Sequence, residues 1–235
     1  MFERPRHRQI EQVLRALESS TLREHGCYFG GGTAIVLLRG EYRESVGIDF
    51  LTSDLAGFRS LRRLLGSGDG DLAPLFKVPG LVGQIGSLRA DQYGIRTRLT
   101  VGDSPIKFEI IFEARIDLDT PGEDEQLCTI PTLTLRDLAA SKLLANTDRY
   151  ADDGVFNRDL IDLAMLECPA PILRSAVAKA ERAYGDAIRR DLERSIDRLG
   201  SRDGWLERCV EALSFRWPVA LLWERIRGLQ RNAHS

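Results

Sequence analysis

The sequence has little lysine, little histidine and no excess of charge of either sign. Only four of its 33 basic residues are lysines, and the rest are arginines. The formal net charge is −2, so any contact with nucleic acid must come from a local patch rather than from the whole chain. Arginine suits bidentate phosphate contacts, although codon usage explains the same bias. The scarce lysines are Lys77, Lys107, Lys142 and Lys179.

Cysteine pairs and long apolar segments are also missing. The four cysteines are scattered without a Cys-x-x-Cys pair, which predicts free thiols in a reducing compartment. The polar start of the chain is not typical of a secretory signal. The apolar runs at residues 34–38 and 219–223 are too short to span a bilayer. Together these features predict a cytoplasmic protein with no membrane partner.

The composition that remains is that of a globular protein, with 43% hydrophobic and 29% charged residues over 235 positions. In the first half, hydrophobic periodicity predicts helices at residues 6–19, 34–38 and 58–65 and strands at residues 26–29, 46–52, 94–101 and 105–115. An acidic loop follows, and the pattern is then helical to the end, with Asn157 predicted to cap one of these helices. The predicted fold class is α+β, with a mixed sheet and flanking helices over residues 1–125 and a helical bundle over residues 126–235.

A glycine turn, Gly30-Gly31-Gly32, lies between a predicted strand and a predicted helix, and Thr33 is predicted to cap that helix. The turn is not a P-loop, because no lysine precedes residue 77. It is not a dinucleotide fingerprint either, because the sixth position is Ile35. Two interpretations remain open. The exposed amides and the helix N-terminus hold a phosphate, or the glycines only relieve crowding in a tight turn.

Four further motifs follow the glycine turn in a fixed order. They are Arg43-Glu44-Ser45-Val46-Gly47-Ile48-Asp49-Phe50, Lys107-Phe108-Glu109, Ala140-Ser141-Lys142-Leu143-Leu144-Ala145 and Arg158-Asp159-Leu160-Ile161-Asp162-Leu163. With them the sequence resembles the AbiEii/AbiGii toxin family of nucleotidyltransferases, which are relatives of DNA polymerase β. The resemblance spans about residues 28–166, and the tail beyond it carries no motif that we recognise.

The resemblance implies both a fold and a reaction. The fold is a nucleotidyltransferase-like core followed by a helical part. The reaction is transfer of a nucleoside monophosphate from a nucleoside triphosphate (NTP) to an acceptor, which in this family can be tRNA. Such proteins often act as toxins that a partner antitoxin neutralises. The reaction also implies Mg²⁺ or Mn²⁺, because divalent cations bridge the triphosphate and the attacking oxygen.

Carboxylates are the ligands that such cations need. Asp49 matches the second aspartate of the family pattern and is implied as a catalytic and metal-binding residue. Glu109 is the best match for a third acid and a second metal ligand, with Glu113 in reserve. Each residue also has an interpretation without a metal. Asp49 is then a carboxylate in a turn at the end of a strand, and Glu109 lies on a strand face that is exposed to solvent.

The helical half carries the other implied site residues. Lys142 is implied to contact the triphosphate and to take part in catalysis, and the alternative is an ordinary exposed helix lysine. Asp159 is implied as a catalytic acid that orients Lys142 or the acceptor, whereas Asp162 is predicted to be structural. Arg43 either contacts phosphate or pairs with an acid. The implied nucleotide-binding residues are Gly31, Gly32, Thr33, Arg43, Ser45 and Lys142.

Gly47 departs from the family pattern, which has a first aspartate at this position. Three explanations remain open. The chain is a natural variant with poor turnover, an active enzyme that uses Glu44, Asp54 or Glu113 instead, or a deliberately inactivated toxin. We predict a metal-dependent nucleotidyltransferase of a toxin–antitoxin pair. The alternative is an impaired nucleotide- or partner-binding module on the same fold. Interleaved acids disfavour a nucleic-acid-binding regulator built on the arginine-rich helices.

Overall fold

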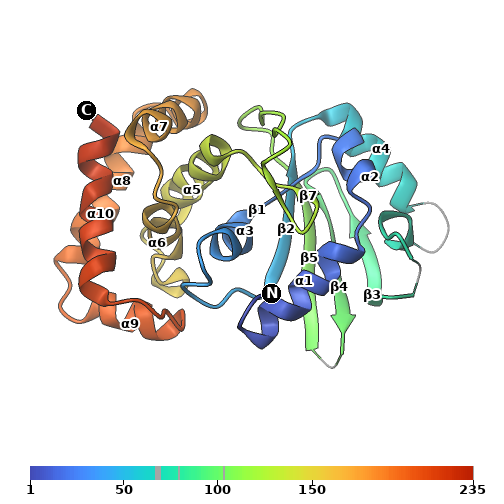
Figure 1. Cartoon of the computed structure of the whole chain (residues 1–235). Coiled ribbons are helices and arrows are strands. Elements are labelled where there is room, and N and C mark those ends of the chain that lie inside the picture. Colours follow the sequence, from blue (N-terminus) through green and yellow to red (C-terminus); the bar gives the residue numbers. More distant parts are fainter. Residues whose placement is uncertain (67–69, 79, 103, 235) are drawn as a thin grey trace. The chain divides into compact units, whose positions relative to one another are not determined.

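The computed structural model describes residues 1–66, 70–78, 80–102 and 104–234 (Figure 1). The chain divides into two compact units. The first unit contains Met1–Leu38 and Ser45–Thr134, and the second contains Arg39–Glu44 and Leu135–Ser235. The second unit therefore starts beyond residue 126 and also takes in a short segment from the N-terminal half.

A five-stranded sheet forms the centre of the first unit, in the order β1-β2-β5-β4-β3. The strands are β1 (Tyr28–Gly30), β2 (Gly47–Thr52), β3 (Gly83–Ala90), β4 (Gly94–Val101) and β5 (Ser104–Phe112). β2 and β5 are parallel, whereas the other neighbours are antiparallel, so the sheet is mixed as predicted. A separate two-stranded sheet joins β6 (Gln126–Leu127) to β7 (Ile130–Pro131).

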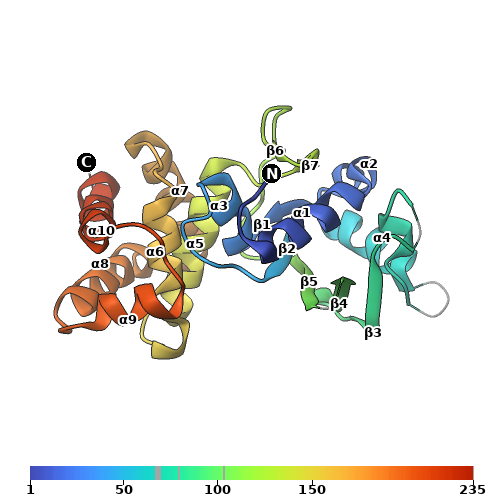
Figure 2. The ribbon, with the colours of Figure 1, turned by 60° about the horizontal axis from the view of Figure 1, so that its bottom comes forward.

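Helices pack on both faces of this sheet. The helices of the first unit are α1 (Pro5–Ala16), α2 (Ser19–Glu24), α3 (Gly31–Leu38), α4 (Leu55–Gly66) and the short 3₁₀ helix η1 (Ala73–Leu75). α1 and α4 contact one face, where Phe58 of α4 stacks on Phe112 of β5, and α3 contacts β1 and β2 from the other side (Figure 2).

Alternation along the strands decides which residues enter the core. Ile48 and Phe50 of β2 and Phe108 and Ile110 of β5 are fully buried. The residues between them point to the opposite face, because successive strand side chains alternate. This alternation presents residues 47, 49, 107 and 109 on one face of the sheet.

Of two predicted helix caps, Thr33 is wrong, and Asn157 occupies the N-cap position of α6 without capping through its side chain. α3 begins at Gly31, so Thr33 lies inside the helix, and its hydroxyl donates to the Gly47 carbonyl oxygen over 2.6 Å instead of capping. Asn157 precedes α6 but makes no capping hydrogen bond. Its side-chain oxygen accepts a hydrogen bond of 2.7 Å from the Trp205 indole. Tertiary partners therefore take both side chains that local pattern assigned to capping.

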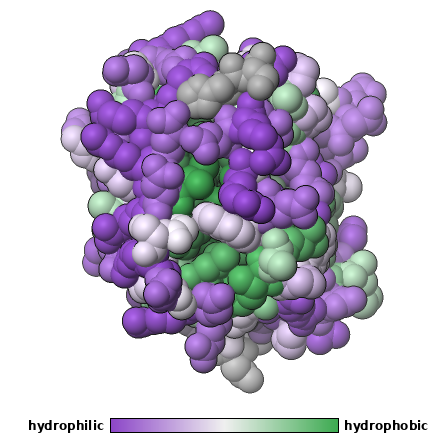
Figure 3. All heavy atoms as spheres, turned by 90° about the vertical axis from the view of Figure 1, so that its left-hand side faces the viewer, coloured by the Kyte–Doolittle hydropathy of each residue, from purple (hydrophilic) through white to green (hydrophobic). Residues whose placement is uncertain are grey.

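The second unit is a helical bundle. Its helices are α5 (Leu135–Arg149), η2 (Asp153–Val155), α6 (Arg158–Met165), α7 (Ala170–Tyr184), α8 (Ala187–Gly200), α9 (Trp205–Ala212) and α10 (Val219–His234). In Figure 3 polar side chains surround a smaller apolar area in the middle of the molecular face that is shown. None of the helices in the described part of the chain has the length and apolar character needed to cross a membrane. The α+β class with a C-terminal helical bundle is confirmed.

Candidate functional site

The glycine turn lies against the Asp49 side chain. Gly30 ends β1 and pairs with Asp49 of β2, and α3 begins at Gly31. Gly31 has a φ of 66°, and a Cβ atom built there would lie 2.8 Å from Oδ2 of Asp49. A larger residue would therefore be strained by the backbone and would collide with the carboxylate. The structure thus brings together the glycine turn and one predicted metal ligand.

Hydroxyl groups tie the start of β2 to α3. Thr33 Oγ1 lies 2.6 Å from Ser45 Oγ, and it also donates to the Gly47 carbonyl oxygen. Because the only Thr33 hydroxyl hydrogen serves Gly47, Ser45 donates to Thr33. The Ser45 amide donates to Nε2 of His7, a fully buried residue that sequence reasoning missed. Thr33 and Ser45 thus hold the segment that enters β2.

Asp49 and Glu109 are paired residues in the neighbouring parallel strands β2 and β5. The Glu109 side chain is 11% exposed, and each of its oxygens contacts a cation. Arg96 Nε lies 3.2 Å from Oε1, and Lys107 Nζ lies 2.5 Å from Oε2. The two predicted metal carboxylates therefore share a sheet face with Lys107 and Arg96.

The residues considered as substitutes for a carboxylate at Gly47 have other roles. Asp54 accepts a hydrogen bond from the Ala56 amide at the start of α4. Glu113 follows the end of β5 and forms an ion pair of 2.7 Å with Arg115. Glu44 is exposed and belongs to the second unit. Within the described ranges, no group of three or more acidic, histidine or cysteine side chains is arranged to hold a metal ion.

Two carboxylates still suit one kind of cation site. Mg²⁺ commonly binds one or two carboxylates together with substrate phosphates, rather than a cage made only of protein groups. Asp49 and Glu109 supply hard oxygen ligands from adjacent positions of one sheet face. This donor set fits a divalent cation that arrives with a triphosphate, and it does not form a complete cage.

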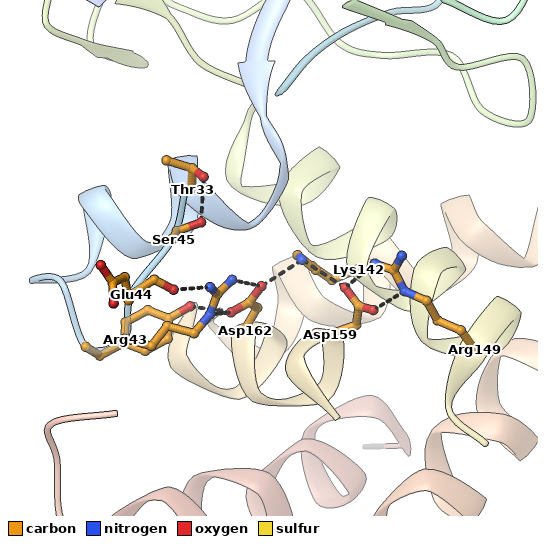
Figure 4. A network of polar contacts seen from close by, with 9 residues as sticks. Thr33, Arg43, Glu44, Ser45, Lys142, Arg149, Asp159 and Asp162 are labelled. Atoms are coloured by element: carbon orange, nitrogen blue, oxygen red, sulfur yellow. Dashed lines mark hydrogen bonds and ion pairs between the residues drawn. The ribbon is translucent and has the colours of Figure 1, made fainter. Parts of the chain in front are cut away.

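A buried network of ion pairs lies in the second unit (Figure 4). Its centre is Asp162 of α6, which has no exposed surface. Arg43 Nε and Nη2 donate to its two oxygens over 2.7 and 2.8 Å, and the Tyr42 hydroxyl donates over 2.7 Å. Lys142 Nζ lies 2.7 Å from the same carboxylate. Arg43 therefore pairs with an acid, which is one of the two interpretations that the sequence left open for this residue.

Lys142 bridges Asp162 to a second acid. Its Nζ atom lies 2.9 Å from Asp159 Oδ1, and Arg149 Nε donates to Asp159 Oδ2 over 2.6 Å. The Lys142 side chain is only 8% exposed, so the alternative of an ordinary exposed helix lysine is wrong. Spacing carried a signal for Arg149, because residues seven apart share one face of a helix and Lys142 is already in the motif.

Charge pairing outweighs burial in this network. Burial alone would raise the pKa of the Asp162 carboxyl, but the charges of Arg43 and Lys142 lower it below its ordinary value. Burial likewise opposes the charged form of Lys142, yet the charges of Asp159 and Asp162 raise its pKa. Lys142 is therefore held as a cation, and both aspartates are held as anions. The catalytic roles predicted for Lys142 and Asp159 stay predictions.

Comparisons with known proteins fit the class that the fold suggests, a nucleotidyltransferase-like core followed by a helical bundle. The family model for the nucleotidyl transferase AbiEii toxin of a type IV toxin–antitoxin system matches residues 12–214. The chain belongs to this AbiEii family. The family implies a nucleoside triphosphate as substrate and an antitoxin as partner.

Similar chains occur among solved structures, and two of them are from Helicobacter pylori. A proposed nucleotidyltransferase from H. pylori shares 15% identity, with 97% of this chain and 94% of that chain covered and a TM-score of 0.48. The JHP933 protein from Helicobacter pylori shares 14% identity, with 99% and 95% covered and a TM-score of 0.50. Identities at this level inform on the fold alone. No curated protein sequence matches the chain.

Proposed function

We propose that this protein transfers a nucleoside monophosphate from a nucleoside triphosphate to an acceptor, with tRNA as the acceptor and a divalent cation, Mg²⁺ or Mn²⁺, as cofactor. The observation that carries the proposal is the contact of the Gly31 turn with Asp49, which is itself paired with Glu109. A phosphate site next to carboxylates is what nucleotidyl transfer requires. The protein acts as the toxin of a pair, and its antitoxin partner suppresses the activity.

The residues of the first unit divide this work. The amides of Gly31 and Gly32, at the N-terminus of α3, bind phosphate oxygens. Thr33 and Ser45 fix the segment that carries Asp49 by their hydroxyl contact of 2.6 Å. Asp49 and Glu109 hold the cation, which when bound neutralises charge that develops on the triphosphate.

The second unit contributes fixed charges. Lys142 is proposed as a nucleotide-binding and catalytic cation, whereas Arg43, which the sequence also offered for nucleotide binding, is held by Asp162. Asp159 is proposed to position Lys142, since the two side chains are 2.9 Å apart. Their burial keeps these groups in one arrangement, which favours electrostatic stabilisation because little reorganisation is needed during the reaction.

Labelled nucleoside triphosphates test the proposal directly. The protein is incubated with each labelled triphosphate, Mg²⁺ and total tRNA, beside its Gly47→Asp variant and an Asp49→Asn control. Label in tRNA that is lost in Asp49→Asn supports the proposed reaction. If neither the natural chain nor Gly47→Asp labels any acceptor, the proposed reaction is rejected.

Gly47 favours a second candidate function, a nucleotide- or partner-binding module without turnover. Loss of one metal carboxylate removes part of an effect worth several kcal/mol of barrier. Calorimetry distinguishes the two functions when it is combined with the labelling assay. Triphosphate binding without label transfer favours the module, and no binding with or without Mg²⁺ leaves only partner binding.

A further inference from the structure

On one face of the sheet, two residues of β2 lie opposite two residues of β5. Gly47 is paired with Lys107, and Asp49 is paired with Glu109. A Cβ atom built on Gly47 would lie 3.8 Å from the Lys107 Cβ atom, which confirms that both positions face the same side. Lys107 therefore stands opposite the position at which the family pattern has its first aspartate.

Lys107 is in contact with a proposed metal ligand. Its Nζ atom lies 2.5 Å from Glu109 Oε2, while Arg96 Nε lies 3.2 Å from Oε1. Both oxygens of Glu109 thus face a cation of the protein itself. The Lys107 side chain is 63% exposed and the Glu109 side chain is 11% exposed. Lys107 can move into solvent at little cost, whereas Glu109 is held in place.

We propose that Lys107 is a resident cation that competes with a divalent metal ion for Glu109. Gly47 offers Lys107 no carboxylate, and the Lys107 ammonium contacts Glu109. A metal ion can bind Oε2 of Glu109 only after Lys107 has left, while Arg96 stays in contact with Oε1. The inference rests on the proposed function in one respect, which is that Glu109 is taken as a metal ligand.

Binding of free Mn²⁺ tests this competition without any need for turnover. The full chain is titrated with Mn²⁺, and unbound Mn²⁺ is measured by electron paramagnetic resonance. We expect Lys107→Met to bind Mn²⁺ about fivefold more tightly, near the upper end of what an exposed ion pair contributes. Circular dichroism of each variant verifies folding.

Arg98→Met provides the matched control. Arg98 is exposed and pairs with Lys107 across β4 and β5, so its replacement removes the same charge one strand away. Long-range electrostatics would strengthen Mn²⁺ binding equally in both variants, whereas competition for Glu109 strengthens it mainly in Lys107→Met. Equal affinities in the two variants, or no gain in Lys107→Met, would overturn the inference.

A second background isolates the carboxylate. When Glu109→Gln is already present, Lys107→Met should change Mn²⁺ affinity no more than Arg98→Met does. The same fivefold gain in that background would show that Lys107 acts elsewhere and would also overturn the inference. The proposed function fails separately: a chain that labels no acceptor but shows the Glu109-dependent gain keeps the competition and loses the reaction.

Discussion

Arg43 and Asp162 form a two-pronged ion pair across 119 positions of the sequence. The pair ties the Arg39–Glu44 segment to α6 inside the second unit. Both side chains are almost fully buried, at 6% and 0% exposure. A guanidinium fork matches a carboxylate geometrically, so the pair positions the segment as well as neutralising charge.

Asp162→Asn should destabilise the protein strongly. The substitution keeps the size of the side chain but leaves Arg43 and Lys142 as buried cations with one anion fewer. Removal of one partner of a buried pair costs about 3–5 kcal/mol. Urea unfolding followed by circular dichroism measures the loss. Glu44→Gln, an exposed neighbour, should stay within about 0.5 kcal/mol of the natural chain. Equal stability of both variants would contradict a structural role for Asp162.

The same carboxylate should make stability depend on acid. Folding lowers the pKa of Asp162 below its ordinary value of 3.8, so the unfolded chain binds more protons between those two values. Its contribution is fully present above the ordinary pKa and is lost as the pH falls through the lowered one. The stability difference between the natural chain and Asp162→Asn should therefore shrink below about pH 4.

Urea titrations at a series of pH values between about 6 and 3 measure this difference. Carboxylates outside the Lys142 network titrate alike in both proteins, so they cancel when the two are compared at each pH. A difference that stays constant down to the lowest pH would show that Asp162 contributes through packing rather than through charge.

Gly31→Ala should weaken the first unit and the contact with Asp49. A residue with a side chain is strained at a φ of 66° by about 1–3 kcal/mol, and here it also meets the carboxylate. Gly86→Ala is the matched control, because Gly86 has a φ of 75° and nothing within 4 Å of an added Cβ atom. Gly31→Ala should lose more stability, measured by urea unfolding. Equal losses would mean that only the backbone angle matters.

The sequence pattern predicted the helices and strands of this fold better than the tertiary contacts of their side chains. The alternation of Ile48 and Phe50 with polar positions was enough to predict β2, because burial on one face fixes the period. Thr33 was predicted to cap a helix, because the local sequence pattern does not indicate its hydrogen bond to the Gly47 carbonyl oxygen. Strand β3 contains Gly83 and Gly86 and is mostly exposed, so its pattern was weak.

For the candidate site, too, the sequence predicted residues better than the contacts between them. The motif order picked out Asp49, Lys142 and Asp159 and offered Lys142 as one partner of Asp159, but it did not indicate Arg149 or the contact of Lys142 with Asp162. Contacts such as that of Tyr42 with Asp162 join residues 120 positions apart, and no periodicity encodes them. Strand alternation is enough to place Lys107 on the same face as Glu109, but its position opposite Gly47 depends on the register of β2 and β5, which the sequence alone did not supply.

Gly47→Asp should restore a carboxylate without disturbing the fold. An added Cβ atom at this position makes only ordinary contacts, 3.7 Å from the Lys107 carbonyl oxygen and 3.8 Å from its Cβ atom. Stability should therefore change by less than about 1 kcal/mol. The new acid lies opposite Lys107 and beside Asp49, so it adds a metal ligand and offers Lys107 a partner other than Glu109.

Both effects should tighten Mn²⁺ binding and raise nucleotidyl transfer about tenfold or more, because metal assistance is worth several kcal/mol. Gly47→Asn, which has the same size but no charge, should show neither gain. Titration with Mn²⁺ and the labelling assay with total tRNA measure the two quantities separately. If Gly47→Asn matches Gly47→Asp in Mn²⁺ affinity and in label transfer, the charge at position 47 has no part in metal binding. The proposed metal-dependent reaction would then lose its basis at this face of the sheet.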